Sequence, residues 1–186
     1  MSMDFYLYLK QTMPDKFKFE RYAMEQGFQI KVHPEIDLMT NAGFCPICLT
    51  DERFADEPGA NAFLTGFELD HDKFTPIKPT TTVSKGFLGL FRKKQPKATP
   101  FDIAIKDSSI VLAVSCSTVD SFEALMAYIF GSYCVKYCNA IFDDPQLGCF
   151  YNNAKEIEIE IERITEELCE EKEAGKLQIH RFEKWL

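Results

Sequence analysis

The chain has 186 residues, 46% of them hydrophobic and 13% aromatic, which fits one folded domain with a sizeable core and excludes a disordered chain. Its formal net charge of −8 disfavours general nucleic-acid binding, because the field of the protein repels a phosphate backbone. No apolar run approaches the roughly 20 residues that span a bilayer, and the N-terminus lacks a small-residue cleavage site, so we expect a cytoplasmic protein.

The first part of the chain predicts a β-α-β unit. Residues 3–9 are apolar and aromatic, which favours a buried strand over a one-sided edge strand. A helix is predicted from Lys16 to Gln26, because Asp15 can begin it and Gly27 stands where a helix commonly ends. Residues 28–32 alternate between apolar and polar side chains, as in a strand.

Two more strands are expected at 43–49 and 62–69. Pro46 has no amide hydrogen, so the first of these is predicted to be an edge strand or a bulged segment. Residues 75–100 combine four prolines with basic residues and no acid, which predicts a long loop.

Residues 101–151 predict two strands, a helix and a hairpin. The strands are expected at 102–106 and 110–116. The helix begins at Thr118 or Asp120, and one face of it carries apolar residues at helical spacing. Gly131 lies inside this helix and would let another element approach closely.

After that helix we expect a short strand near 140–142, a turn from Asp143 to Gly148 and a return strand at 149–151. The last long segment, 153–173, is predicted to be a helix, because its apolar residues recur at intervals of four, three and four. The glutamates of this segment then lie on its outer rows. Four of them follow one another at four-residue spacing: Glu158, Glu162, Glu166 and Glu170.

These elements together predict an α+β fold. We expect a single domain over residues 1–186, with a mixed, mainly antiparallel sheet, about three helices packed on it and a loop insertion at about 75–100.

The seven cysteines are odd in number and scattered, unlike the even set that forms the disulfides of a small secreted protein, so most are expected to be buried free thiols. Cys45 and Cys48 have the spacing of a redox motif or of half a zinc site, and Cys134 with Cys138 could complete four thiolate ligands if the fold joined the pairs. The strand-like surroundings of Cys45 and Cys48 argue against a redox motif and favour buried or incidental cysteines. The sequence contains no phosphate-binding or dinucleotide-binding glycine motif, and we predict no catalytic residue, no metal ligand and no cofactor.

Two further motifs have competing interpretations. Asp70, His71 and Asp72 look like an acid/base cluster, but neighbours in a strand point to opposite faces, which favours a surface strand end. The segment from Lys85 to Lys97 mixes phenylalanines and leucines with basic residues, as a solvated loop or a membrane-contacting patch would.

Three stretches carry a resemblance to a known group of proteins: the strand FLTGFELD, the pair of predicted strands at 101–116, and the helix SFEALMAYIF leading to IFDDPQLGCFY. In this organisation the run from Phe63 to Tyr151, about half of the chain, resembles the immunity proteins that bacteria encode beside polymorphic or contact-dependent toxins. The long basic insertion departs from a compact version of that pattern. These families share no universal functional residues, so the resemblance assigns no site.

The resemblance implies a protein that binds and neutralises one cognate toxin without catalysis. An acidic chain suits a basic toxin such as a nuclease, which itself binds phosphate. The alternatives are a small enzyme with a site assembled from distant residues, and a membrane-peripheral adaptor that uses residues 86–94. The candidate partner-binding residues are Asp143, Asp144, Glu158, Glu162, Glu166 and Glu170.

Overall fold

The computed structural model describes residues 2–55, 59–76, 98–117 and 119–185. Its strands are β1 (Ser2–Leu9), β2 (Gln29–Val32), β3 (Gly43–Thr50), β4 (Ala62–Lys73), β5 (Ile110–Ser117), β6 (Ile141–Asp144), β7 (Cys149–Tyr151) and β8 (His180–Arg181). Its helices are α1 (Lys16–Glu25), α2 (Pro100–Ala104), α3 (Ser121–Cys138) and α4 (Ala154–Glu173), with one 3-10 turn at Glu52–Phe54. The predicted α+β single domain is confirmed.

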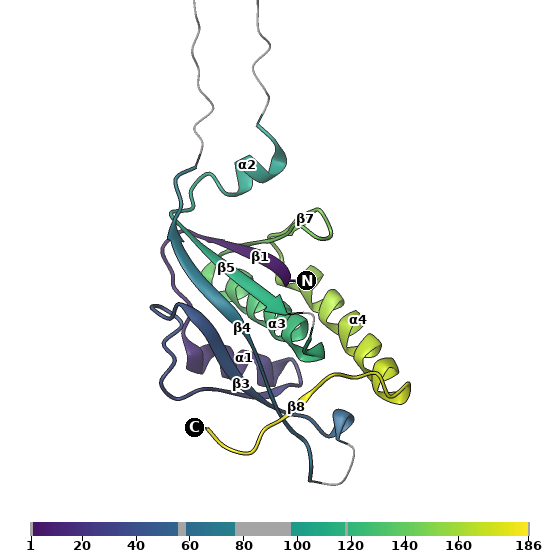
Figure 1. Cartoon of the computed structure of the whole chain (residues 1–186). Coiled ribbons are helices and arrows are strands. Elements are labelled where there is room, and N and C mark those ends of the chain that lie inside the picture. Colours follow the sequence, from purple (N-terminus) through teal and green to yellow (C-terminus); the bar gives the residue numbers. More distant parts are fainter. Residues whose placement is uncertain (1, 56–58, 77–97, 118, 186) are drawn as a thin grey trace, which may run out of the picture.

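The strands form one sheet in the order β2-β3-β4-β5-β1-β6-β7, and every pairing in the described part of the chain is antiparallel (Figure 1). The first strand lies in the middle of the sheet, because β1 pairs with β5 on one side and β6 on the other. β8 pairs with Phe63 and Leu64 of β4, beyond the residues that β5 covers. The C-terminal segment therefore extends the sheet where β5 ends.

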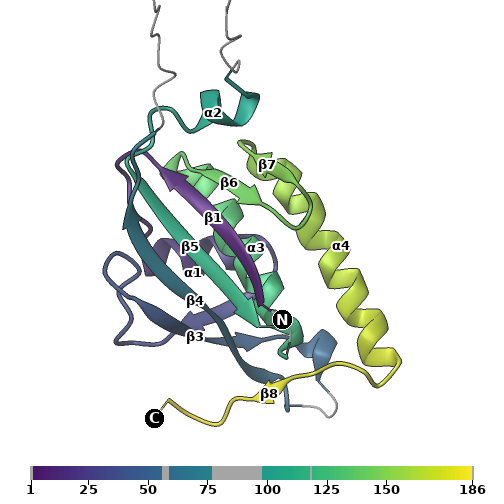
Figure 2. The same cartoon turned by 45° about the horizontal axis from the view of Figure 1, so that its top comes forward.

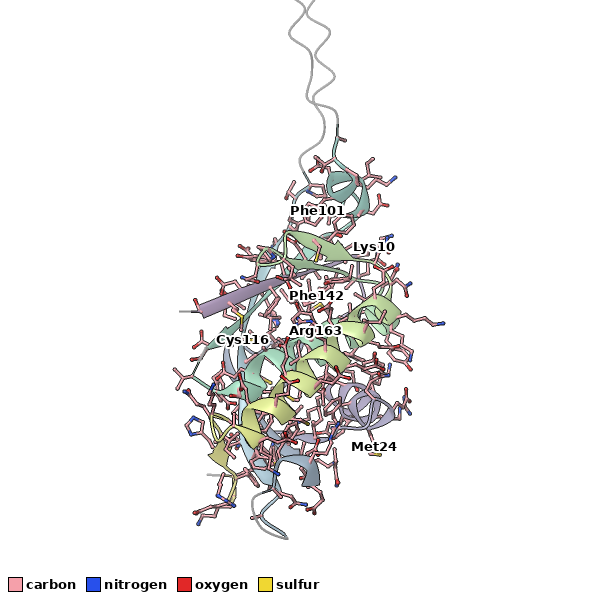
Figure 3. All side chains as sticks on the ribbon, turned by 90° about the vertical axis from the view of Figure 1, so that its right-hand side faces the viewer. Lys10, Met24, Phe101, Cys116, Phe142 and Arg163 are labelled. Carbon is pink, nitrogen blue, oxygen red and sulfur yellow. The ribbon has the colours of Figure 1, made fainter. Side chains whose placement is uncertain are left out.

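The three long helices lie on the same side of the sheet (Figure 2). α3 runs against the sheet and is flanked by α1 and α4, and 13 of its 18 residues are buried. The prediction of one apolar face for α3 was therefore too narrow, because α4 covers the side of α3 that turns away from the sheet. Figure 3, seen from the side of α4, places Phe142 between the sheet and the helices.

Gly131 gives α3 its close approach to the sheet, as the sequence predicts. A Cβ atom at this position would lie 2.9 Å from the ring of Phe142 on β6. Phe142 has no exposed surface and packs on Phe5 of β1, with the ring centroids 5.6 Å apart. A larger residue in place of Gly131 would have to displace this ring.

The predicted helix starts are confirmed at the level of single hydrogen bonds. The backbone amide of Lys18 donates to the Asp15 side chain at the start of α1, and that of Phe122 donates to Asp120 at the start of α3. Asn153 caps α4 in the same way. These side chains accept from amides that have no partner inside the helix.

Two predictions about strands were wrong. Residues 102–106 are not a strand, because Pro100 begins the short helix α2 and Thr99 and Asp102 close a reciprocal capping box over it. β3 is not an edge strand, because it lies between β2 and β4. Pro46 is tolerated there since it stands where β2 has ended, and its carbonyl accepts from the His33 amide at 2.9 Å.

The basic segment Lys85–Lys97 and most of the predicted loop at 75–100 lie outside the described residues. Among the helices that the structure does describe, none is both long and apolar enough to span a bilayer.

Candidate functional site

The acidic row on α4 is held outward by the apolar residues on the other side of the helix. Ile157, Ile161, Ile164 and Leu168 are buried, as predicted. Glu162, Glu166 and Glu170 are exposed, and they make no ion pair or side-chain hydrogen bond with any described residue. We call these three residues the helix row.

Glu158 does not share this environment although it follows the same spacing. Its carboxylate accepts a hydrogen bond from the Tyr22 hydroxyl at 3.1 Å and one from the side-chain amide of Gln26 at 3.5 Å. Burial raises the pKa of Tyr22 well above its ordinary value, and the Glu158 charge raises it further. Glu158 therefore joins α4 to α1.

Asp144 is not a surface residue, which corrects its prediction as a partner contact. It is 1% exposed, and its carboxylate accepts from the Tyr128 hydroxyl and from the backbone amides of Gln146 at 2.9 Å and Leu147 at 3.2 Å. Its role is to fix the β6–β7 turn onto α3. Asp143 points to the opposite face of the sheet, and burial, followed by the Asp144 charge, raises the pKa of its carboxyl.

A cleft of about 360 Å3 lies between the start of α3, the β6–β7 turn and α4. Asp120 lines it, and burial raises the pKa of this carboxyl while its oxygen caps α3. Arg163 also lines it, and its guanidinium is held by Glu160 at 2.9 Å and Glu167 at 2.5 Å (Figure 3). The charged groups of the cleft are thus engaged with neighbours from the protein itself.

The cysteines do not gather into a site. All seven lie in the described part of the chain, five are buried and none is in a disulfide. Cys45 and Cys48 lie three positions apart on β3 and therefore point to opposite faces of the sheet. Burial raises the pKa of Cys45 to about 12, so its thiol stays protonated at neutral pH. Within the described residues no group of three or more metal-ligating side chains occurs.

His71 is separated from its two acidic neighbours in the same way. Asp70 and Asp72 are exposed on one face of β4, while His71 pairs with Leu112 and turns toward the helices. The three residues do not meet at one site, in agreement with the interpretation favoured from the sequence.

The face of the sheet opposite the helices is the surface that sequence reasoning missed. On β1, Phe5, Leu7 and Leu9 point to the helices, whereas Asp4, Tyr6 and Tyr8 point away. In the view of Figure 1 this face is turned to the reader, and no described helix lies over its centre. Among the described residues from β4 to β6, no Lys or Arg points to this face, because Lys73 of β4 points to the other one. Five acids do point to it: Asp4, Glu68, Asp70, Asp72 and Asp143.

The signal for this face was present in β1, where Tyr6 and Tyr8 alternate with Phe5, Leu7 and Leu9. Because both sets are apolar, the strand was predicted to be buried on both sides. In the structure Tyr6 and Tyr8 are half-buried. We call this surface, with its five acids and two tyrosines, the open sheet face.

A search of protein-family models, curated proteins and solved structures finds no match for this chain.

Proposed function

We propose that this protein is a non-catalytic binding protein of the immunity type, which holds a basic toxin domain in a stoichiometric complex. The observation that carries the proposal is the helix row: Glu162, Glu166 and Glu170 are exposed and unpaired within the described chain. Like charges at four-residue spacing cost a helix a few tenths of a kcal/mol each, so this row does nothing for the fold.

Other acids near the helix row serve the fold, and this contrast supports the proposal. Glu160 and Glu167 pair with Arg163, and Glu158 accepts from Tyr22. A row of uncompensated carboxylates along a well-anchored helix presents a fixed negative potential. Complementary charge of this kind speeds encounter with a basic partner and disfavours acidic ones.

A basic toxin domain fits this surface because a nuclease must carry cationic groups that bind phosphate. An inhibitor that offers carboxylates at similar positions competes for those groups. The complex therefore needs no chemistry from the inhibitor.

The test is co-purification from the native host at low salt, identification of the bound protein, and growth rescue when the two are expressed together. In the variant Glu162→Lys/Glu166→Lys/Glu170→Lys, association with that protein should slow at least tenfold and rescue should fail. The matched control reverses three exposed acids elsewhere, Glu35→Lys/Asp107→Lys/Glu183→Lys, and should associate within about twofold of the unmodified protein. Equal loss in both variants, or association that does not depend on salt, would exclude the helix row.

A further inference from the structure

We propose that the open sheet face is a second interaction surface, which binds an extended segment of a protein partner with Lys or Arg at alternate positions. This inference is independent of the helix row, because α4 lies on the other side of the sheet (Figure 1). It rests on the charge of the face, on a hollow at one end of it and on aromatic rings at the other.

The charge of the open sheet face is of one sign over neighbouring strands. Glu68, Asp70 and Asp72 follow one another on β4, all exposed, and Asp4 lies across β5 from them. The first and last of the three on β4 are four residues apart, which is about 13 Å along a strand. An extended chain with cationic side chains at every second position has the same repeat, so it can match these carboxylates one by one.

The hollow occupies about 330 Å3 where β5 ends. Glu68 and Glu123 line it together with Phe44, which is 44% exposed. The backbone amide of Ser117 donates to the Glu123 carboxylate and so fixes that side chain at the wall of the hollow. This volume is near the lower limit of pockets for whole small molecules, roughly 300 Å3, and suits one long side chain better.

The two carboxylates of the hollow favour a cationic occupant. Burial raises the pKa of Glu123 above its ordinary value, and the charges of Asp120 and Glu68 add to this rise, while the Ser117 amide and His180 lower it in part. A Lys or Arg side chain would relieve this repulsion while its methylene groups lie against the Phe44 ring.

Aromatic rings bound the other end of the open sheet face. Tyr8 packs edge-on against Phe74, at 4.9 Å between ring centroids, and against Phe101 of α2, at 5.4 Å. Tyr6 lies in one row with Asp143 on β6 and, across β5, with Asp70 on β4. Faces of tyrosine rings beside carboxylates attract Arg and Lys in addition to the direct charge attraction.

The experiment titrates isotopically labelled protein with the peptide acetyl-Gly-Lys-Val-Arg-Val-Lys-Gly-amide and follows backbone amide shifts by NMR. We expect saturable shifts in β1, β4 and β5, and at least fivefold weaker binding of the scrambled peptide acetyl-Gly-Lys-Lys-Arg-Val-Val-Gly-amide. The scrambled peptide keeps the charge and loses the alternation. Shifts confined to α4, no saturable shift, or equal affinity for the two peptides would overturn the proposal.

Two variants that remove the same charge locate the binding. The variant Glu68→Gln/Asp70→Asn/Asp72→Asn should bind the alternating peptide at least tenfold more weakly than the unmodified protein does. The variant Glu162→Gln/Glu166→Gln/Glu170→Gln should bind it less than twofold more weakly. Asn keeps the local hydrogen bonds that the Asp70 and Asp72 side chains accept from backbone amides at 2.8 Å. Equal weakening in the two variants would assign the effect to net charge and overturn the proposal. The peptide experiment needs no toxin, so a failure to find one leaves its result unchanged.

Discussion

The two faces of the sheet differ in chemistry although they are built from alternate residues of the same strands. On β1, Phe5 is 2% exposed and packs on Tyr128 and Phe142, while its neighbour Tyr6 is half-buried on the open sheet face. The covered face is apolar and excludes water, whereas the open face combines tyrosines with carboxylates. Stability is therefore concentrated on one side of the sheet, which leaves the other side free to vary with what it binds.

The difference between the two faces can be tested most directly by removing one ring from each face of the same strand. Phe5→Ala should lower the free energy of unfolding by about 3–5 kcal/mol, because it deletes a buried ring and leaves a cavity. Tyr6→Ala should cost about 1 kcal/mol, because its ring is partly hydrated before the change. Urea denaturation of both variants measures the difference. Equal losses would mean that the open sheet face is packed as tightly as the covered one.

A smaller effect is expected where α3 meets the covered face. Gly131→Ala should cost about 1–3 kcal/mol by overpacking, since the new methyl group would lie 2.9 Å from the Phe142 ring. In an exposed helix the same change would stabilise by roughly 1 kcal/mol, so the sign of the effect is informative.

The double variant Gly131→Ala/Phe142→Leu provides the control for this contact. The smaller Leu leaves room for the methyl group, so Gly131→Ala should cost less in that background than in the unmodified protein. Additive losses in the two single variants and the double variant would show that the two residues do not press on each other.

The smallest effect concerns the charge of the open face. Glu123 has a raised pKa in the folded protein, so its ionisation opposes folding at neutral pH. This penalty is absent below the ordinary carboxyl pKa of 4.5, grows as the pH rises from there to the folded pKa, and is constant above it. Glu123→Gln should therefore raise the free energy of unfolding by a few tenths of a kcal/mol at pH 7, because solvent screens the half-exposed group, and leave it unchanged near pH 4.

Thermal or urea unfolding at the two pH values tests this sign. Glu35→Gln serves as the comparison, since that side chain is exposed and lies outside the acidic rows of α4. A gain for Glu123→Gln at pH 4 that equals the gain at pH 7 would mean that its charge is not the cause.

The sequence predicted most of the helices and strands because their signals are local. The helices α1, α3 and α4 begin after the capping residues Asp15, Asp120 and Asn153. The spacing of the buried residues on α4 is that of one face of a helix. The error at 102–106 was also local: the capping pair Thr99 and Asp102 outweighed an alternating pattern of five residues.

The candidate site was predicted less well because it depends on contacts between distant segments. The sequence grouped Asp144 with Asp143, yet the Tyr128 hydroxyl reaches it from α3 and buries it. Glu158 has the same spacing as the helix row and differs only because Tyr22 of α1 lies opposite. Predicting the open sheet face requires the order of the strands in the sheet, and the residue pattern of a single strand does not contain that order.

The central position of β1 also shapes how the chain must fold as it leaves the ribosome. Its neighbours begin at Ile110 and Ile141, so about 100 residues must be synthesised after β1 before either edge of that strand has a partner. At roughly 5–20 residues per second this takes about 5 to 20 seconds. During that time an apolar segment with unpaired backbone groups is available to chaperones or to other nascent chains, and both of its native strand pairings are long-range in sequence.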